Sequence, residues 1–140
     1  MRKFTKMFFA LALTMCCAMS ANAGKKVLLA SDFEDGNVLL NGWGNSQTRD
    51  IVDGAFHVNN PSAVNSWESQ IAYDFSDPFL PNNEYTLTCK IRGSAAGQIT
   101  FGLQNAEDSY KSVGEFGTID FDVDWVNVRV KCLCNGEGGK

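Results

Sequence analysis

Two short runs of carboxylates are the first residues of this chain whose types and spacing could do chemistry. The stretch SDFEDGN (31–37) brings acidic oxygens together just before a glycine, which suits a hard cation such as calcium without matching the EF-hand pattern. Asp120, Asp122 and Asp124 form the second run. Glycoside hydrolysis needs two carboxylates that face each other across a sugar. Nothing singles out such a pair, so we expect the second run to be a solvated strand end.

The other residues that could act as nucleophiles or bases form no catalytic pattern. The chain has one histidine, His57, and no GxSxG sequence. Cys89, Cys132 and Cys134 share strand parity with apolar neighbours, which predicts buried thiols. A disulfide from Cys89 to Cys132 or Cys134 is the alternative. A zinc site is disfavoured because the CLC spacing is not that of a zinc knuckle.

Aromatic residues in polar surroundings are the stronger functional lead. Trp67 is flanked by Asn, Ser, Glu and Gln, and Tyr110 lies in the polar loop NAEDSYKSVGE (105–115). An exposed ring beside amides and carboxylates suits a sugar, because the ring covers the C–H face while the polar groups meet the hydroxyls. For Trp43 and Trp125 we expect packing roles, beneath a loop and at a strand start respectively.

Alternating apolar residues predict strands throughout the chain. The expected strands are 26–30, 49–52, 55–58, 70–75, 85–92, 98–104, 117–121 and 125–134. Asp53-Gly54 is a hairpin signal between the second and third of these. If 85–92 and 98–104 also form a hairpin, through GSAAG (93–97), they present one shared polar face. Short strands separated by turns predict an all-β fold, either a β-sandwich or a jelly roll.

The N-terminus predicts a signal peptide over residues 1–23. Three positive charges precede an apolar run at 7–19 that is too short to span a bilayer, and ANA (21–23) fits a cleavage site. Lipoprotein attachment at Cys16 or Cys17 is the alternative, which the methionine before Cys16 disfavours. We therefore expect a domain of residues 24–140 that is secreted or held at the cell surface or in the periplasm.

Charge narrows the classes of partner. The chain carries 12 Lys and Arg against 16 Asp and Glu, a net charge of −4, and removal of the first 23 residues would bring it to −7. An acidic domain without a basic run is poorly suited to nucleic acid or to anionic membrane surfaces. No other apolar stretch approaches spanning length. We expect neither a nucleic-acid partner nor a membrane span.

An ordered set of motifs resembles a known family. The motifs SDFEDGN, GWGN, NSWESQIAYDF, PNNEYTLTCKIRGSAAG, ITFGLQ, SYK and DWVNVRV cover nearly all of residues 27–134. The set resembles the carbohydrate-binding modules of families four and nine, most closely those on secreted xylanases of polysaccharide-degrading Bacteroidetes. The resemblance implies a jelly-roll β-sandwich of the galactose-binding-like kind. Its cleft would hold one glycan chain, xylan or mixed-linkage β-glucan.

The resemblance also implies roles for single residues. The tryptophan that serves as a sugar platform falls on Trp67, and the polar residue three positions later falls on Gln70. A second platform in a later loop falls on Tyr110, and an amide that lines the cleft falls on Gln104. The FE pair that often supplies a structural calcium ligand ends at Glu34. Trp67 and Gln70 share a face only if Trp67 lies in an entry loop or at a bulge, because their spacing puts them on opposite faces of a regular strand.

The family has one or two further strands after its counterpart of DWVNVRV, including a late aspartate that helps to hold calcium. This chain ends instead at the glycine-rich NGEGGK (135–140), so we expect the last strand or strands of the domain to be missing. The expected function is non-catalytic binding of plant cell-wall polysaccharide, which holds an attached or associated glycoside hydrolase on its substrate. The domain would be a monomer or a module of a larger enzyme. The alternatives are an N-terminal fragment of an endo-xylanase-type glycoside hydrolase and a cell-surface β-sandwich that binds protein.

Overall fold

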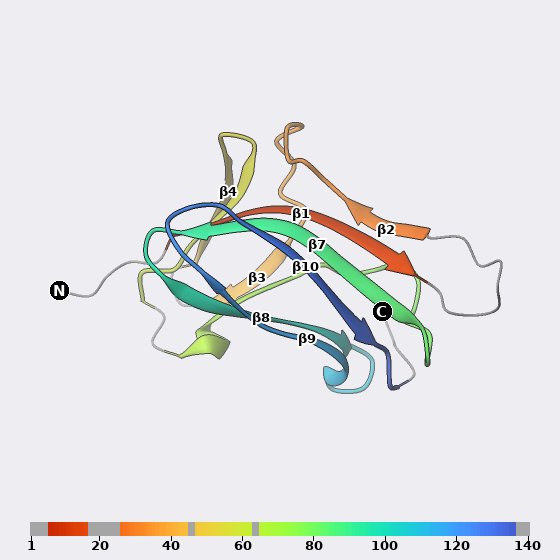
Figure 1. The fold of residues 1–140 in the computed structure, drawn as a ribbon. Coiled ribbons are helices and arrows are strands. Elements are labelled where there is room, and N and C mark those ends of the chain that lie inside the picture. The colour runs from red at the N-terminus through yellow and green to blue at the C-terminus, as the bar shows by residue number, and fades with distance from the viewer. Residues whose placement is uncertain (1–5, 17–25, 45–46, 63–64, 137–140) are drawn as a thin grey trace.

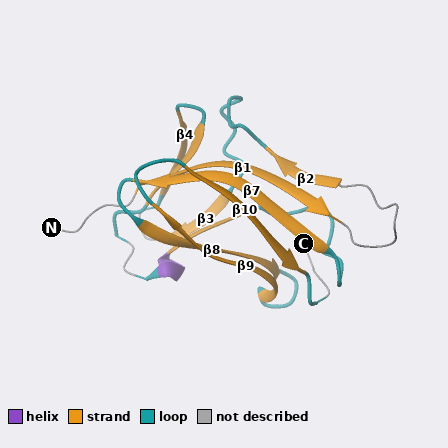
Figure 2. Ribbon diagram, in the orientation of Figure 1, coloured by secondary structure: helices purple, strands orange, loops and turns teal. Residues whose placement is uncertain are grey.

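The computed structural model describes residues 6–16, 26–44, 47–62 and 65–136 of the 140-residue chain. Its strands are β1 (Lys6–Cys16), β2 (Lys26–Ala30), β3 (Asn41–Gly44), β4 (Thr48–Val52), β5 (Ala55–Asn59), β6 (Ser69–Ala72), β7 (Glu84–Gly93), β8 (Gly97–Asn105), β9 (Lys111–Phe121) and β10 (Val126–Leu133). One 3₁₀-helix, η1 (Ser66–Glu68), precedes β6, and Figure 2 shows strands and loops in the rest of the described chain. The predicted all-β class is confirmed.

Six of the strands form one sheet (Figure 1). Its order is β10-β7-β1-β5-β4, and β2 pairs with the far end of β1. β1 is antiparallel to β7 from Met7 to Cys16 and antiparallel to β5 over its first four residues. β1 is therefore the strand that joins the two halves of this sheet.

Residues 6–16, which we expected to lie outside the fold in a signal peptide, thus form a central strand. The register pairs Leu11 with Cys89 and Leu13 with Leu87, so the odd-numbered residues of β1 lie opposite the core-facing residues of β7. An apolar run satisfies a strand between two neighbours as well as the apolar region of a signal peptide, because both need low polarity. Cleavage after Ala23 concerns the processing of the chain and stays a prediction.

The remaining strands form two small sheets, β3–β6 and β8–β9. Figure 1 shows β8 and β9 below the six-stranded sheet, with η1 beside them. The largest core cluster draws on both levels and contains Phe33, Leu40, Phe56, Val58, Cys89, Ile91, Phe121 and Val128. Ile71 of β6 and Ile99 of β8 pack against the same cluster. Apolar contact therefore holds the small sheets against the large one.

Most predicted strands are confirmed, and the differences have local causes. β9 begins at Lys111, earlier than predicted, because two irregularities in its register with β8 carry the pairing past Gly117 and Gly114. β3 was not predicted, since NGWG has the composition of a turn. The Asp53-Gly54 hairpin is confirmed, and both residues have positive φ, +52° and +67°, as a two-residue turn of type I′ requires.

β7 and β8 do not form the hairpin that GSAAG (93–97) suggested. β8 pairs with β9, whereas β7 lies in the six-stranded sheet. The connection closes around Phe121: a Cβ at Gly93 or Gly97 would lie 2.5 or 2.7 Å from the Phe121 ring. Glycine at both positions lets the backbone pass the ring as the chain crosses from one sheet to the other. The polar faces of β7 and β8 consequently belong to different surfaces.

Candidate functional site

A pair formed by Trp43 and Gln70 is the first element of a candidate site. The two residues are directly opposite each other in the β3–β6 ladder. Cross-strand partners share a face, and the neighbouring pair, Gly42 with Ile71, lies on the other face, where Ile71 packs against the core. The Trp43 side chain is 49% exposed, and Gln70 is also exposed. An indole ring and an amide therefore lie side by side on the outer surface.

This position corrects the packing role that we expected for Trp43. The turn-like sequence NGWGN hid a strand in which Trp43 has outward parity. The polar and glycine neighbours of Trp43 were the available signal, since the same kind of surroundings pointed to exposure at Trp67.

Trp67 lies on η1, immediately before β6, and is 66% exposed. This is the entry position that would let Trp67 and Gln70 serve one surface. Hydrogen bonds hold the turn: the Asn65 N–H donates to Glu68 Oε2 at 2.8 Å, and Asn60 Nδ2 donates to the Glu68 carbonyl at 2.6 Å. The ring is thus carried by a short helix whose backbone is fixed on both sides.

The side chain of Gln47 connects the two strands beneath this surface. Its Nε2 donates to the carbonyls of Trp43 and Gln70, at 3.0 and 3.2 Å. The backbone positions of both residues are therefore set by a shared donor, which restrains the distance between the Trp43 and Gln70 side chains.

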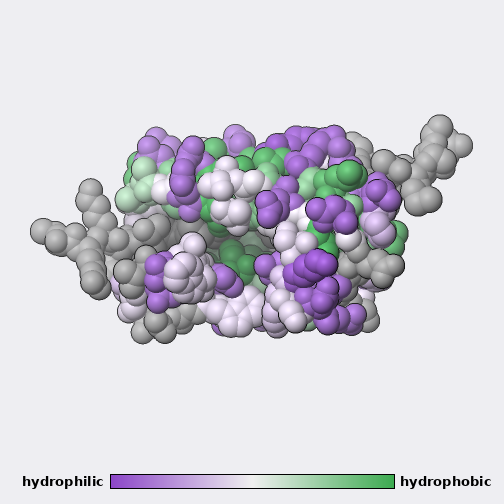
Figure 3. Space-filling model, turned by 90° about the horizontal axis from the view of Figure 1, so that it is seen from below, coloured by the Kyte–Doolittle hydropathy of each residue, from purple (hydrophilic) through white to green (hydrophobic). Residues whose placement is uncertain are grey.

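The molecular face that carries η1, β8 and β9 is hollowed near its middle (Figure 3). Hydrophobic side chains are visible at the floor of this hollow, and polar side chains surround it. A concave apolar floor with a polar rim is the usual character of a ligand-binding surface.

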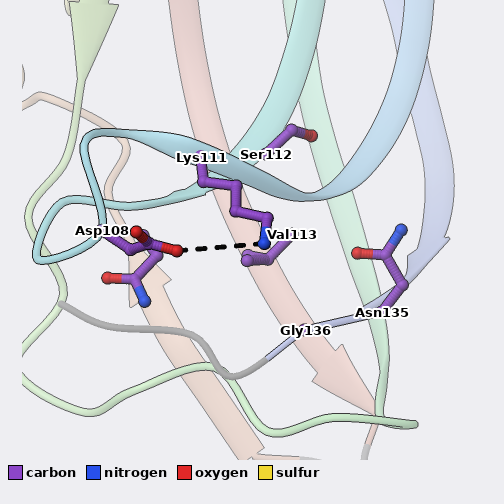
Figure 4. A pocket seen from close by; sticks show the side chains of 7 residues that line it. Asp108, Lys111, Ser112, Val113, Asn135 and Gly136 are labelled. Carbon is purple, nitrogen blue, oxygen red and sulfur yellow. Dashed lines mark ion pairs between the residues drawn. The ribbon is translucent and has the colours of Figure 1, made fainter.

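Gln104 and Tyr110 lie at one end of the β8–β9 hairpin. Gln104 is exposed on β8 opposite Ser112, and Tyr110 is 59% exposed with a φ of +57° in the turn before β9. A cavity of about 390 Å³ lies beside this turn, lined by Asn105, Asp108, Lys111, Ser112, Val113, Asn135 and Gly136. Figure 4 shows Lys111 reaching toward Asp108, with a nitrogen–oxygen distance of 3.9 Å.

The four predicted ligand-binding residues therefore fall into two groups. Trp67 and Gln70 lie together with Trp43 on the β3–η1–β6 unit, whereas Gln104 and Tyr110 lie on β8–β9. These two units belong to separate hydrogen-bonded sheets.

The acidic loop at 31–37 uses its oxygens to stabilise its own backbone. Asp32 Oδ1 accepts from the Glu34 N–H at 3.1 Å, and Asp35 accepts from the backbone and side chain of Asn37 at 3.0 and 2.6 Å. These hydrogen bonds from Asn37 lower the pKa of Asp35. Glu34 is exposed, and its carboxylate lies against Gly54 in the neighbouring hairpin turn.

Among the described residues no three His, Cys, Asp or Glu side chains gather as a metal site. Glu34 therefore has no acidic co-ligands within that part of the chain, and calcium binding at Glu34 stays a prediction.

The other carboxylates are bound or exposed at strand ends. Asp120 accepts from Gln98 Nε2 at 2.7 Å, and Asp122 accepts from the Val123 N–H at 2.8 Å. Asp120, Asp122 and Asp124 are all exposed, as predicted for a solvated strand end. His57 lies opposite Asp50, with 2.6 Å between His57 Nδ1 and Asp50 Oδ1.

The three cysteines are buried free thiols, as predicted. The alternative disulfide is wrong for Cys89 and Cys132: Cys89 pairs with Val128, and Cys132 pairs with Tyr85 four residues along the ladder. That offset separates the two cysteines by about 13 Å, well beyond bridging distance.

Trp125 does not pack in the core as we expected. Its ring is 41% exposed on the outer side of the six-stranded sheet, and the guanidinium carbon of Arg92 lies 4.7 Å from the ring centroid. A cation–π contact thus replaces burial at this strand start.

Comparisons with known proteins find no relative: no protein-family model matches the chain, and neither do curated proteins or solved structures. No helix within the described ranges is long and apolar enough to cross a membrane.

Proposed function

We propose that this protein is a non-catalytic glycan-binding module whose site is the surface formed by Trp43, Trp67 and Gln70. The observation that carries the proposal is the Trp43–Gln70 cross-strand pair with Trp67 on the helix that leads into it. Two large rings that are half or more exposed are costly for a surface with no ligand, since indoles are usually largely buried.

The chemistry of this surface matches a sugar better than an apolar ligand. Each indole offers a flat face for the C–H side of a pyranose, and Gln70 offers both a donor and an acceptor for hydroxyls. The unit lies on the β3–η1–β6 segment, which its hydrogen bonds hold in place, so the rings lose little freedom on binding.

The proposed substrate class is a plant cell-wall polysaccharide, xylan or mixed-linkage β-glucan, as the resemblance to carbohydrate-binding modules implies. In this proposal the six-stranded sheet and the two small sheets are the layers of a jelly-roll sandwich. Gln104 and Tyr110 on β8–β9 extend the same site, and Glu34 supplies a structural calcium ligand. The protein acts after export, by holding an associated glycoside hydrolase near its substrate.

Affinity electrophoresis of the purified protein tests the proposal, in native gels that contain xylan, mixed-linkage β-glucan or no polymer. We expect retardation in one polymer, and a loss of affinity of about tenfold or more for Trp43→Ala and for Trp67→Ala. Leu80→Ala, which removes another exposed apolar side chain, is the matched control and should run as the parent does.

The same gels separate the alternatives. Free migration of a folded protein in every polymer would contradict the glycan proposal and favour a protein-binding surface. Release of reducing sugar from a retained polymer would identify an enzyme. Retardation that Tyr110→Ala leaves unchanged would restrict the site to the β3–η1–β6 unit.

A further inference from the structure

Positive charge is concentrated on the outward side of β7 and β10. Along these strands the outward cross-strand pairs are Lys90 with Asn127, Arg129 with Thr88 and Lys131 with Thr86, and the next pair toward the strand ends is Arg92 beneath Trp125. We call this set the cationic face. Lys90, Asn127, Arg129 and Lys131 are exposed, and Trp125 is 41% exposed.

The inward side of the same strands explains why these residues face outward. Leu87, Cys89, Ile91 and Val128 are buried, and strand geometry sends their neighbours to the opposite side. Because the strands are paired, alternate residues of two segments that are far apart in the sequence form one surface. Neither segment contains a basic run, so the sequence alone gives no sign of the face.

The charge of this face is opposite to that of the chain. The face carries four cations, Lys90, Arg92, Arg129 and Lys131, and one carboxylate, Glu84, at its end. The whole chain has a net charge of −4. Positive potential is thus gathered on one side of an acidic protein, which attracts an anionic ligand to that side.

Within the face, the two central cations have no ion-pair partner among the described residues. Lys131 Nζ contacts Glu84 Oε1 at 2.6 Å, and Arg92 stacks on Trp125. Lys90 and Arg129 form no such contact in the described part of the chain. They are diagonal neighbours across the ladder, about 7–8 Å apart. They are therefore the cations with charge to spare for a ligand.

We infer that the cationic face is a second binding surface, for an acidic polysaccharide that carries carboxylate groups on its sugars. Lys90 and Arg129 would pair with two uronate carboxylates, since charged hydrogen bonds are the strongest that such a flat face can offer. Thr88 and Asn127 lie between these cations and supply donors and acceptors for sugar hydroxyls. The Trp125 ring, held by Arg92, supplies an apolar platform at one end.

The same features argue against nucleic acid as the ligand. Duplex DNA carries a charge about every 1.7 Å and is bound by many cations at once, and a protein of net charge −4 repels it elsewhere on its surface. A polyuronate has lower charge density and presents hydroxyls between its carboxylates. The face is independent of the Trp43–Trp67 surface, so the two proposals can fail separately.

The test measures binding of the protein to polygalacturonate by affinity electrophoresis, at low salt and at about 0.15 M NaCl. We expect binding that weakens with salt. Lys90→Gln should weaken it about threefold or more, and Lys90→Gln combined with Arg129→Gln about tenfold or more. Lys26→Gln, which makes the same charge change at an exposed lysine paired with Asp77, is the control and should bind as the parent does.

Three results would overturn the inference. The first is no retardation by polygalacturonate at low salt. The second is an equal loss for Lys90→Gln and Lys26→Gln, which would show a response to net charge alone. The third is equal retardation by duplex DNA at the same charge concentration, or loss of polygalacturonate binding in Trp67→Ala, which would place the ligand elsewhere.

Discussion

Individual side chains show how far parity alone determines a residue's surroundings. Alternation placed Cys89, Cys132 and Cys134 in the core correctly, because the partner residues of regular strands must face the same way. Burial raises the pKa of Cys89 to about 11 and that of Cys132 to about 12. For Cys132 the nearby Cys134 and Glu84 add to the effect. These thiols are therefore protonated and unreactive at neutral pH.

At the residue scale we predict that the folded protein resists thiol reagents at pH 8, whereas the unfolded protein reacts at all its cysteines. The raised pKa values also predict lower stability in alkali. The unfolded thiols lose their protons near pH 9, the folded ones only near pH 11–12, so stability is full below pH 9 and falls from there to about pH 12. Mass spectrometry after iodoacetamide treatment, and urea midpoints from pH 7 to 11, check both. Rapid labelling of Cys89 in the native protein would contradict the prediction.

Tryptophan positions were less predictable than cysteine positions. Trp67 was correctly expected on the surface, since every flanking residue is polar, whereas Trp43 and Trp125 were expected to pack. Trp43 depends on the register of β3, which NGWGN does not reveal, and Trp125 depends on a cation from another strand. Local sequence cannot report a partner that lies more than 30 residues away.

Among the elements, the connection between β7 and β8 shows the limit of turn signals. Glycines at 93 and 97 indicated a turn correctly, but not that the turn joins different sheets. The deciding residue is Phe121, which is 24 residues beyond Gly97 and fills the space against both glycines. Strand positions were predictable from alternation, whereas pairing partners depend on such long-range packing.

At the element scale we predict that Gly97→Ala destabilises the protein by about 1–3 kcal/mol, because its new methyl group would overlap the Phe121 ring. Urea unfolding measures the loss. Phe121→Leu removes the ring, so Gly97→Ala should cost much less in that background, and the double-mutant cycle gives the coupling. Equal costs in both backgrounds would show that the ring is not the obstacle.

In the molecule as a whole, the largest difference from the sequence analysis concerns β1. The motifs placed strands throughout residues 26–134 without it, yet β1 lies between β5 and β7 and connects the two halves of the main sheet. The features that predict export, an apolar run and few charges, are also those of a strand with neighbours on both sides. Composition cannot separate these roles, because it does not contain the pairing.

At the molecular scale we predict that a protein comprising residues 24–140 is less stable than the full chain by about 3 kcal/mol or more, because β7 and β5 each lose a partner. Leu11→Pro in the full chain is the matched variant, since proline removes a ladder hydrogen bond without shortening the chain. Urea midpoints compare the three proteins. Equal midpoints for 1–140 and 24–140 would show that β1 does not support the sheet.

The position of β1 also sets a schedule. β1 is synthesised first, but β5 ends at Asn59 and β7 ends at Gly93, so its partners are completed much later. At about 5–20 residues per second, residues 6–16 wait roughly 4–15 seconds for β7 to be made. During that delay no ladder competes for the segment that we expect to direct export, and a targeting receptor would meet it as a free chain. The topology thereby leaves time for delivery before folding can claim the strand.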